Sequence, residues 1–323
     1  MVERTSILLA SVVLFGVGLF VAGPSHAISV SAGDLFVLDE LVGVVHVDAE
    51  TGDETIIPTP GLNLNPNALV LDGDGHHLIL ISRRDLIRFD PVSGVSSILT
   101  SGGYLDDFVG RVGLGREGEI LFTSTRLVAP GDLDGTIVRV DRATGDQFPV
   151  HSGGLLFSVW DVATDSNGNY FVESSSAVVR IDGETGAQSF FLLDAGVIYG
   201  RLAVLPDDRL VVARHESPGA TPNTLLTIDP ASGSSSQVPV PLFATGVVTT
   251  DQGEVYYSGC EGIDEVCGEG IVSRITPDPE DLYLGLGPKA FDVVPLPEPG
   301  VPALLLAGIA FLVVLRDFRQ RRS

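Results

Sequence analysis

The sequence has 323 residues and a net charge of −23 at pH 7, and its 38 Gly and 20 Pro interrupt short β-prone runs. Such an acidic surface repels the phosphates of nucleic acids, so we exclude a nucleic-acid-binding protein. Frequent turn residues between short runs rich in Val, Ile and Phe favour an all-β fold.

The first 27 residues have the pattern of a secretory signal peptide. Arg4 precedes an apolar run over residues 7–22, and Gly-Pro-Ser-His-Ala then ends at Ala27. Small residues at positions 25 and 27 are typical of a signal-peptide cleavage site, so we expect cleavage after Ala27 and export across the inner membrane. An uncleaved membrane anchor is the alternative.

A short strand followed by an Asp-x-x-Thr/Ser-Gly turn recurs six times, and its clearest copy is IVRVDRATG at residues 137–145. The first turn residues are spaced by 42, 51, 41, 47 and 47 positions; they are Asp48, Asp90, Asp141, Asp182, Asp229 and, in degenerate form, Thr276. Strand-only repeats of about 40–50 residues are typical of β-propeller blades.

Most copies are preceded by two β-prone runs joined by a tight turn and are followed by one more run, which makes four strands per repeat. The first repeat has only three runs, at 34–38, 44–47 and 55–57, whereas residues 291–294 stand alone at the far end. We therefore predict one domain over residues 28–295, an all-β, six-bladed β-propeller of four-stranded blades. The C-terminal strand completes the N-terminal blade, so that no sheet edge is left open.

These repeats resemble the six-bladed propellers of the NHL, SMP-30/gluconolactonase and streptogramin-lyase group, whose blades carry a run similar to DVATDSNGNYFV at residues 161–172. The resemblance implies the fold and leaves the chemistry open, because one scaffold carries many unrelated functions.

One position beside the central channel breaks the repeat. When the first strands are aligned on the turns that follow them, this position is occupied by Ala68, Arg111, Asp161, Arg201, Gly246 and Asp292. Arg111, Asp161, Arg201 and Asp292 are therefore candidate ligand-binding residues of the channel. A network of mutually neutralising charges is the alternative.

The two faces of the predicted propeller differ. The loops from the fourth strand to the next blade, and from the second strand to the third, share one face and are irregular, and we call this the irregular face. The opposite face, here called the turn face, carries short regular hairpin turns. Because binding residues concentrate on irregular loops, we expect the binding surface on the irregular face.

No residue is assigned a catalytic or metal-binding role. The resemblance to SMP-30-type lactonases implies an alternative, a hydrolase with calcium or another divalent ion in the channel, but no spacing of carboxylates enforces such a site. Streptogramin lyases need a His base and a Glu. His215 and Glu216 are adjacent and would point to opposite sides of a strand.

Cys260 and Cys267 are the two cysteines of the sequence. In an exported chain an isolated even pair within one loop is most simply a disulfide, and we predict one here.

The C-terminal segment, residues 296–323, has three parts in a fixed order. Pro297, Glu298 and Pro299 come first, an apolar stretch over residues 301–315 follows, and a basic tail ends the segment with Arg316, Arg319, Arg321 and Arg322. The apolar stretch is shorter than the about 20 residues that span a bilayer unaided, and the Arg cluster would stop transfer on the cytoplasmic side.

This arrangement resembles the PEP-CTERM sorting signal of Gram-negative bacteria. The resemblance implies recognition at the Pro-Glu-Pro motif by an exosortase-type sorting enzyme in organisms that make exopolysaccharide, with a plain membrane anchor as the alternative. We therefore expect an exported, membrane-anchored and then cell-surface or extracellular propeller that binds an exopolysaccharide or a surface protein without catalysis or cofactor. The alternative is an exported metal-dependent, lactonase-like hydrolase or a lyase.

Overall fold

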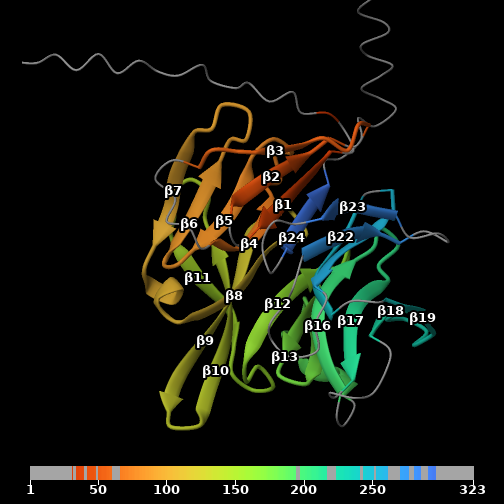
Figure 1. Ribbon diagram of the computed structural model, residues 1–323. Coiled ribbons are helices and arrows are strands. Elements are labelled where there is room, and N and C mark those ends of the chain that lie inside the picture. Colours follow the sequence, from red (N-terminus) through yellow and green to blue (C-terminus); the bar gives the residue numbers. More distant parts are fainter. Residues whose placement is uncertain are drawn as a thin grey trace, which may run out of the picture.

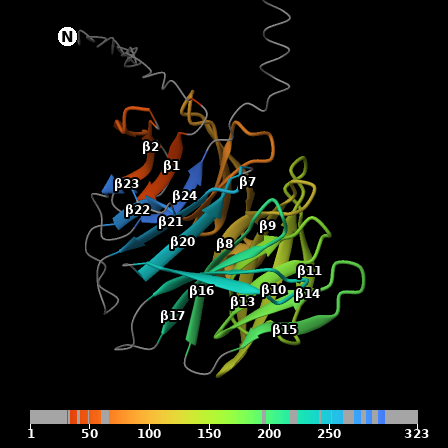
Figure 2. The ribbon, with the colours of Figure 1, turned by 90° about the vertical axis from the view of Figure 1, so that its right-hand side faces the viewer.

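The computed structural model describes residues 31, 34–39, 42–48, 50–59, 66–193, 197–216, 223–240, 243–250, 252–260, 270–275, 280–284 and 290–295. These residues form six four-stranded antiparallel sheets arranged as the blades of a β-propeller, in chain order around the ring (Figures 1 and 2). The predicted fold class is confirmed.

The blades are numbered in chain order, and within each the strands are given from the channel outwards. Blade 1 contains β24 (Ala290–Pro295), β1 (Leu35–Asp39), β2 (Gly43–Val47) and β3 (Glu54–Ile56). Blade 2 contains β4 (Pro66–Leu71), β5 (Leu78–Ser82), β6 (Asp85–Phe89) and β7 (Ser96–Ser101). Blade 3 contains β8 (Phe108–Leu114), β9 (Ile120–Ala129), β10 (Asp132–Val140) and β11 (Gln147–Ser152).

The second half of the ring repeats this order. Blade 4 contains β12 (Val159–Thr164), β13 (Tyr170–Ser174), β14 (Ala177–Ile181) and β15 (Gln188–Leu193). Blade 5 contains β16 (Val197–Val204), β17 (Leu210–Glu216), β18 (Thr224–Ile228) and β19 (Ser235–Pro239). Blade 6 contains β20 (Phe243–Thr249), β21 (Val255–Cys260), β22 (Gly270–Arg274) and β23 (Glu280–Leu284).

The C-terminal strand closes the ring as predicted. β24 pairs antiparallel with β1, with Leu38 opposite Asp292 and Leu35 opposite Pro295. The innermost strands β4, β8, β12, β16 and β24 converge on the middle of the molecule (Figure 1).

The hydrophobic core consists of six clusters, one between each pair of neighbouring blades. In blade 1, Phe36 and Leu38 pack towards blade 2, whereas Leu35 and Val37 pack towards blade 6. Alternate residues of a strand point to opposite faces, so a strand buried on both faces has a continuous apolar sequence. Each blade therefore contributes to two core clusters. A blade by itself, outside the ring, would have no neighbour to cover either face.

Three elements differ from the sequence-based expectation. The β9–β10 hairpin is longer than the others and projects from the ring, which accounts for the 51-residue spacing (Figure 1). The outer strand β23 follows the degenerate Thr276 turn, where the sequence lacks the usual Asp and Gly. A short 3-10 helix, η1 (Gly103–Asp106), precedes blade 3.

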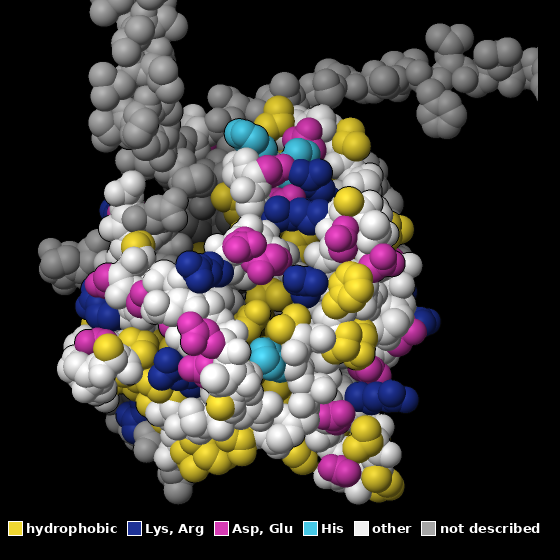
Figure 3. All heavy atoms as spheres, turned by 180° about the vertical axis from the view of Figure 1, so that it is seen from behind, with side chains coloured by type: hydrophobic (Ala, Val, Ile, Leu, Met, Phe, Trp, Pro, Cys, Tyr) yellow, Lys and Arg dark blue, Asp and Glu magenta, His cyan; other side chains and the backbone are white. Residues whose placement is uncertain are grey.

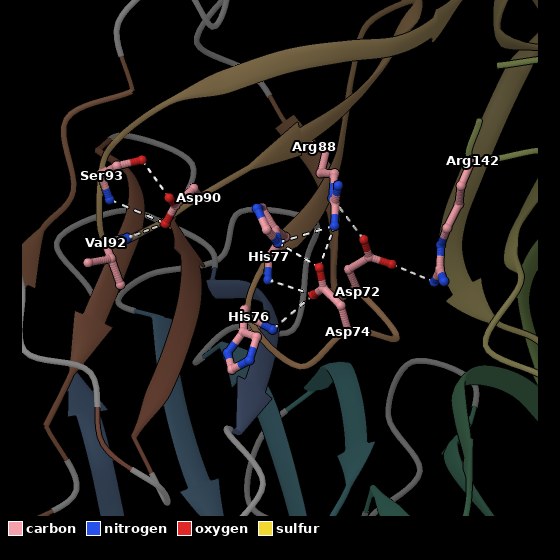
Figure 4. Close-up of polar contacts among 9 residues, drawn as sticks. All are labelled: Asp72, Asp74, His76, His77, Arg88, Asp90, Val92, Ser93 and Arg142. Atoms are coloured by element: carbon pink, nitrogen blue, oxygen red, sulfur yellow. Dashed lines mark hydrogen bonds and ion pairs between the residues drawn. The ribbon is translucent and has the colours of Figure 1, made fainter. Parts of the chain in front are cut away.

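The recurring Asp closes its turn through its side chain. Asp90 Oδ1 accepts hydrogen bonds from the backbone N–H groups of Val92 and Ser93 at 2.9 and 3.2 Å (Figure 4). The Ser93 hydroxyl, the backbone N–H of Ser93 and that of Val92 together hold the pKa of Asp90 below its usual value, against the effect of burial. The Asp residues of the repeat are therefore turn residues, which agrees with their preference for such local hydrogen bonds.

The glycine that ends each turn provides a test of blade packing. Gly145 and Gly233 have φ values of 75° and 70°, where any L side chain costs about 1–2 kcal/mol. A Cβ on Gly145 would overlap the carbonyl oxygen of Leu99 in blade 2, whereas one on Gly233 would meet no described atom within 4 Å.

We expect Gly233→Ala to lower the free energy of unfolding by about 1 kcal/mol, for the backbone conformation alone. Gly145→Ala should cost about 1–3 kcal/mol more, because blade 2 must also shift. Urea unfolding of both variants measures the difference, and equal losses would contradict the close contact between blades 2 and 3.

Candidate functional site

Every innermost strand has a bulge at the aligned channel position. In blades 3 and 5 the register shift spans two residues, Gly110-Arg111 and Gly200-Arg201, between Val109 and Val112 and between Tyr199 and Leu202. In the other blades it leaves out one residue, directly before Ala68, Asp161, Gly246 or Asp292. Bulges re-aim side chains, so the bulge of each innermost strand directs the residue at the aligned position towards the channel.

A cavity of about 520 Å³ occupies the channel between these bulges and the turn face. Arg111, Asp161, Arg201 and Gly246 line one end of it, and the turn residues Asp72, Gly73, Gly75 and Thr250 line the other. Three predicted channel residues thus share one cavity, which extends towards the turn face. On the face shown in Figure 3, hydrophobic side chains lie near the middle, with basic and acidic side chains around them.

Asp161 joins two blades. Its Oδ1 accepts a hydrogen bond from the backbone N–H of Val162 at 2.9 Å, and its Oδ2 accepts one from the backbone N–H of Leu202, in blade 5, at 3.1 Å. The residue is 8% exposed. These contacts give Asp161 a structural role between β12 and β16.

Glu173, on β13, is a site residue that the sequence analysis missed. It lies opposite Asp161, where blades 1, 2 and 6 have Leu38, Ile81 and Ser258. Comparing second strands as well as first strands would have revealed this departure from the repeat.

Glu173 lies among charged groups in a buried setting. Its Oε2 is 4.0 Å from Arg201 Nη1, and its side chain is 8% exposed. Burial raises the pKa of Glu173 to about 8; nearby Arg201 and Arg111 lower it, and Asp161 raises it. Glu173 is therefore largely protonated at neutral pH, which departs from a simple network of paired charges.

Asp292 and His215 were also singled out from the sequence. Asp292 occupies the aligned position on β24, and its side chain lies outside the described residues. His215 is buried on β17, with Nδ1 3.2 Å from Asn223 Oδ1.

The remaining predictions are untested by the structure. Cys260 ends β21, whereas the residues of the other calls lie outside the described part: Ala27, Cys267, Pro297, Glu298, Pro299, Arg316, Arg319, Arg321 and Arg322. Within the described residues, no helix is long and apolar enough to cross a membrane. The same residues contain no group of three or more His, Cys, Asp or Glu side chains that could hold a metal ion.

The irregular face of blades 3 and 4 exposes large apolar side chains. We call this set the apolar patch; it comprises Phe108, Leu127, Val128, Phe157 and Trp160, which are 45–69% exposed. Hydrogen bonds connect the strands that carry it: Thr123 Oγ1 on β9 donates to the carbonyl of Trp160 at 3.2 Å, and Thr125 lies opposite Phe108. Exposed apolar groups gathered on adjacent elements are typical of an interaction surface.

The turn after β4 joins blade 2 to blade 3 on the turn face (Figure 4). The buried carboxylate of Asp72 forms ion pairs with Arg88, at 2.9 Å, and with Arg142 of blade 3. Burial raises the pKa of Asp74, but hydrogen bonds from the backbone N–H groups of His76 and His77 and from the His77 ring outweigh it and lower the pKa. This cluster explains the acidic, His-containing turn as a joint between blades.

No protein-family model matches the sequence, and no curated protein matches it. Solved structures share the fold. A chain of a nidogen–laminin complex is 11% identical, with a TM-score of 0.63 over 81% of this chain and 98% of that one. Virginiamycin B lyase from Staphylococcus aureus, in an inactive form with quinupristin, is 13% identical, with a TM-score of 0.50 over 78% and 84%. A gluconolactonase from Xanthomonas campestris is 15% identical, with a TM-score of 0.52 over 69% and 76%.

These comparisons confirm the six-bladed propeller and its structural neighbours in the streptogramin-lyase and gluconolactonase group. A fold at such low identity serves unrelated activities, so the residues of the channel and of the apolar patch must carry the functional argument.

Protonation of buried Glu173 predicts a pH dependence of stability. A carboxyl whose pKa is raised by folding stabilises the protein below its unfolded pKa, and this contribution is lost as pH rises through the folded pKa. Glu173 alone should thus lower the free energy of unfolding by about 1.4 kcal/mol per pH unit between about pH 5 and 8.

Glu173→Gln should remove this slope. Urea unfolding measures the free energy of unfolding at pH 5.5 and at pH 7.5. The decrease between these two pH values should be about 2–3 kcal/mol smaller in the variant than in the wild type. Glu184→Gln, in an exposed turn, is the matched control. A wild-type slope retained in Glu173→Gln would show that Glu173 is ionised in the folded protein.

Proposed function

We propose that this chain is an exported surface protein that binds a polysaccharide at the apolar patch without catalysis. The observation that carries the proposal is the gathering of exposed aromatic side chains, Phe108, Phe157 and Trp160, on the irregular face of two neighbouring blades. Export and sorting rest on the two terminal sequence signals.

Aromatic side chains on a rigid surface suit the faces of sugar rings. Phe, Tyr and Trp offer a large apolar area at a low conformational-entropy cost, and Trp adds an N–H donor. Trp160 lies at the bulge of β12, where its backbone carbonyl accepts a hydrogen bond from Thr123 of blade 3. β12, which presents the indole ring of Trp160, is thus held by blades 3 and 4, and this favours a preformed binding surface.

The charge of the chain agrees with a neutral polymer as the partner. At −23 overall, the protein repels strongly acidic chains over long distances, whereas apolar contacts with a neutral sugar chain are not affected by this charge. If no polysaccharide binds the wild type, a protein partner of the same patch becomes the favoured alternative.

We expect Trp160→Ala to weaken binding to a neutral polysaccharide at least tenfold, which corresponds to about 1.4 kcal/mol, because aromatic contacts dominate such surfaces. Affinity electrophoresis in gels containing a panel of neutral and uronic-acid polysaccharides measures the dissociation constants. Phe108→Ala should show a loss in the same direction.

Phe190→Ala is the matched control, because Phe190 is 51% exposed on the outer strand β15, away from the apolar patch. Polysaccharide binding at this patch would be refuted if every polymer retarded Trp160→Ala as strongly as the wild type. It would also be refuted if no polymer retarded the wild type.

The sorting part of the proposal has its own test. Processing near Pro297, Glu298 and Pro299 should remove the basic tail, so mass spectrometry of the extracellular protein should find no peptide with Arg322. An extracellular protein that retains Arg322 would contradict processing and support a plain anchor.

A further inference from the structure

We propose that the turn face is the membrane-proximal face of the anchored protein, so that the apolar patch on the irregular face points away from the bilayer. The orientation concerns the chain before processing, and it rests on the C-terminal membrane segment of the function proposed above. It adds the direction from which a partner reaches the apolar patch.

The C-terminal strand of the propeller ends on the turn face. Val47 is the last residue of β2 before the Asp48 turn, which belongs to this face. Leu35, the first residue of β1, pairs with Val47 on one side and with Pro295 on the other. Pro295, the last residue of β24, therefore lies at the turn face beside the start of β1. The ring begins and ends on one face.

Side-chain contacts hold the start of β1 in blade 1. Asp34 is buried, and its Oδ2 accepts a hydrogen bond from the backbone N–H of Ser31 at 2.7 Å. The same oxygen lies 2.8 Å from Nε2 of the buried His46, on β2. Because β24 pairs with β1 along its length, these contacts also fix the direction of β24 relative to the ring.

The chain between the propeller and the proposed membrane segment is short. Five residues, 296–300, separate Pro295 from the apolar stretch that begins at Val301. A fully extended chain covers at most about 3.6 Å per residue, so this segment reaches no farther than roughly 20 Å.

That reach cannot bring the irregular face to the bilayer. A route around the ring would cross the four strands of a blade, about 4.8 Å apart, and then the height of the innermost strands, roughly 20 Å. The innermost strands have six to eight residues, which gives this height at about 3.3 Å per residue. The segment therefore keeps the turn face towards the bilayer.

The charge of the turn face opposes close contact with anionic lipid. Every hairpin turn of this face between residues 48 and 254 contains Asp or Glu, whereas the basic residues of these turns are Arg116, Arg142 and Arg209. Anionic headgroups repel such a face, and at physiological salt the repulsion extends over about 8 Å. The short segment and the repulsion act in opposite directions, so the turn face lies above the headgroups across a narrow gap.

Trp160 is the one Trp of the sequence, so its fluorescence reports the distance of the irregular face from a bilayer. Residues 28–323, the form expected after signal-peptide cleavage, are reconstituted into neutral vesicles that contain a lipid with a dansyl-labelled headgroup. Energy transfer from Trp to dansyl is measured against unlabelled vesicles. Trp160→Phe/His76→Trp should transfer at least about threefold more than the wild type, because the irregular face lies roughly 20 Å farther away.

His76 suits this variant because it is exposed in a turn of the turn face and contacts Asp74 through its backbone N–H (Figure 4). Trp160→Phe/Phe157→Trp, which keeps a Trp on the irregular face, is the matched control and should transfer as weakly as the wild type. Trp160→Phe alone gives the background. Equal transfer from the wild type and from the His76→Trp variant, or stronger transfer from the wild type, would overturn the orientation.

Flotation of the same vesicles separates this proposal from the one on which it rests. A chain that does not float with the vesicles would contradict the membrane segment and the orientation together. A chain that floats and gives equal transfer would contradict the orientation alone. Loss of polysaccharide binding in Trp160→Ala has no bearing on either measurement.

Anionic vesicles test the gap. At low salt the His76→Trp variant should transfer less in anionic than in neutral vesicles, and about 0.5 M salt should remove the difference, because the charges are then screened within a few Å. Equal transfer in the two kinds of vesicle at low salt would contradict a gap that depends on the charge of the turn face.

Discussion

Antiparallel pairing of β24 with β1 joins the two ends of the propeller, and the rest of the structure depends on this closure. In an open chain, Leu35 and Val37 of blade 1 would lose their packing against Tyr256 and Val272 of blade 6, and β1 would present an unpaired edge. Each of the six core clusters lies between two blades, so no blade can bury both of its faces alone. Closure therefore stabilises every blade, not only the first.

Closure also positions the channel residues. The ring brings six innermost strands together, and a bulge at the same height in each of them places one position of every blade around the channel. Glycine is needed beside the arginine of blade 3, because a Cβ on Gly110 would overlap the carbonyl oxygen of Trp160. The two-residue Gly-Arg bulge thus combines close packing of adjacent blades with a charged side chain directed at the cavity.

The two candidate surfaces use different physical properties of one scaffold. The apolar patch depends on the long β9–β10 hairpin and on loops of the irregular face, whereas the cavity is lined by the innermost strands. Glu173 is buried beside Asp161, which lines the cavity. For this reason the pKa of Glu173 is raised, while the pKa values of the turn residues Asp141 and Asp182 are lowered by local hydrogen bonds.

The number of blades, the closing strand and the aligned channel position could all be predicted from the residues, because strand periodicity and Asp-Gly turns are local properties repeated along the chain. Three features emerged only from the folded ring: Asp161 is held by the backbone of blade 5, Glu173 belongs to the charged cluster, and the cavity extends to the turn face. Those features depend on bulges and on packing between blades, which join residues about 40 positions apart. In sequence Glu173 is an ordinary strand residue; burial beside Arg111 and Arg201 gives it its chemistry.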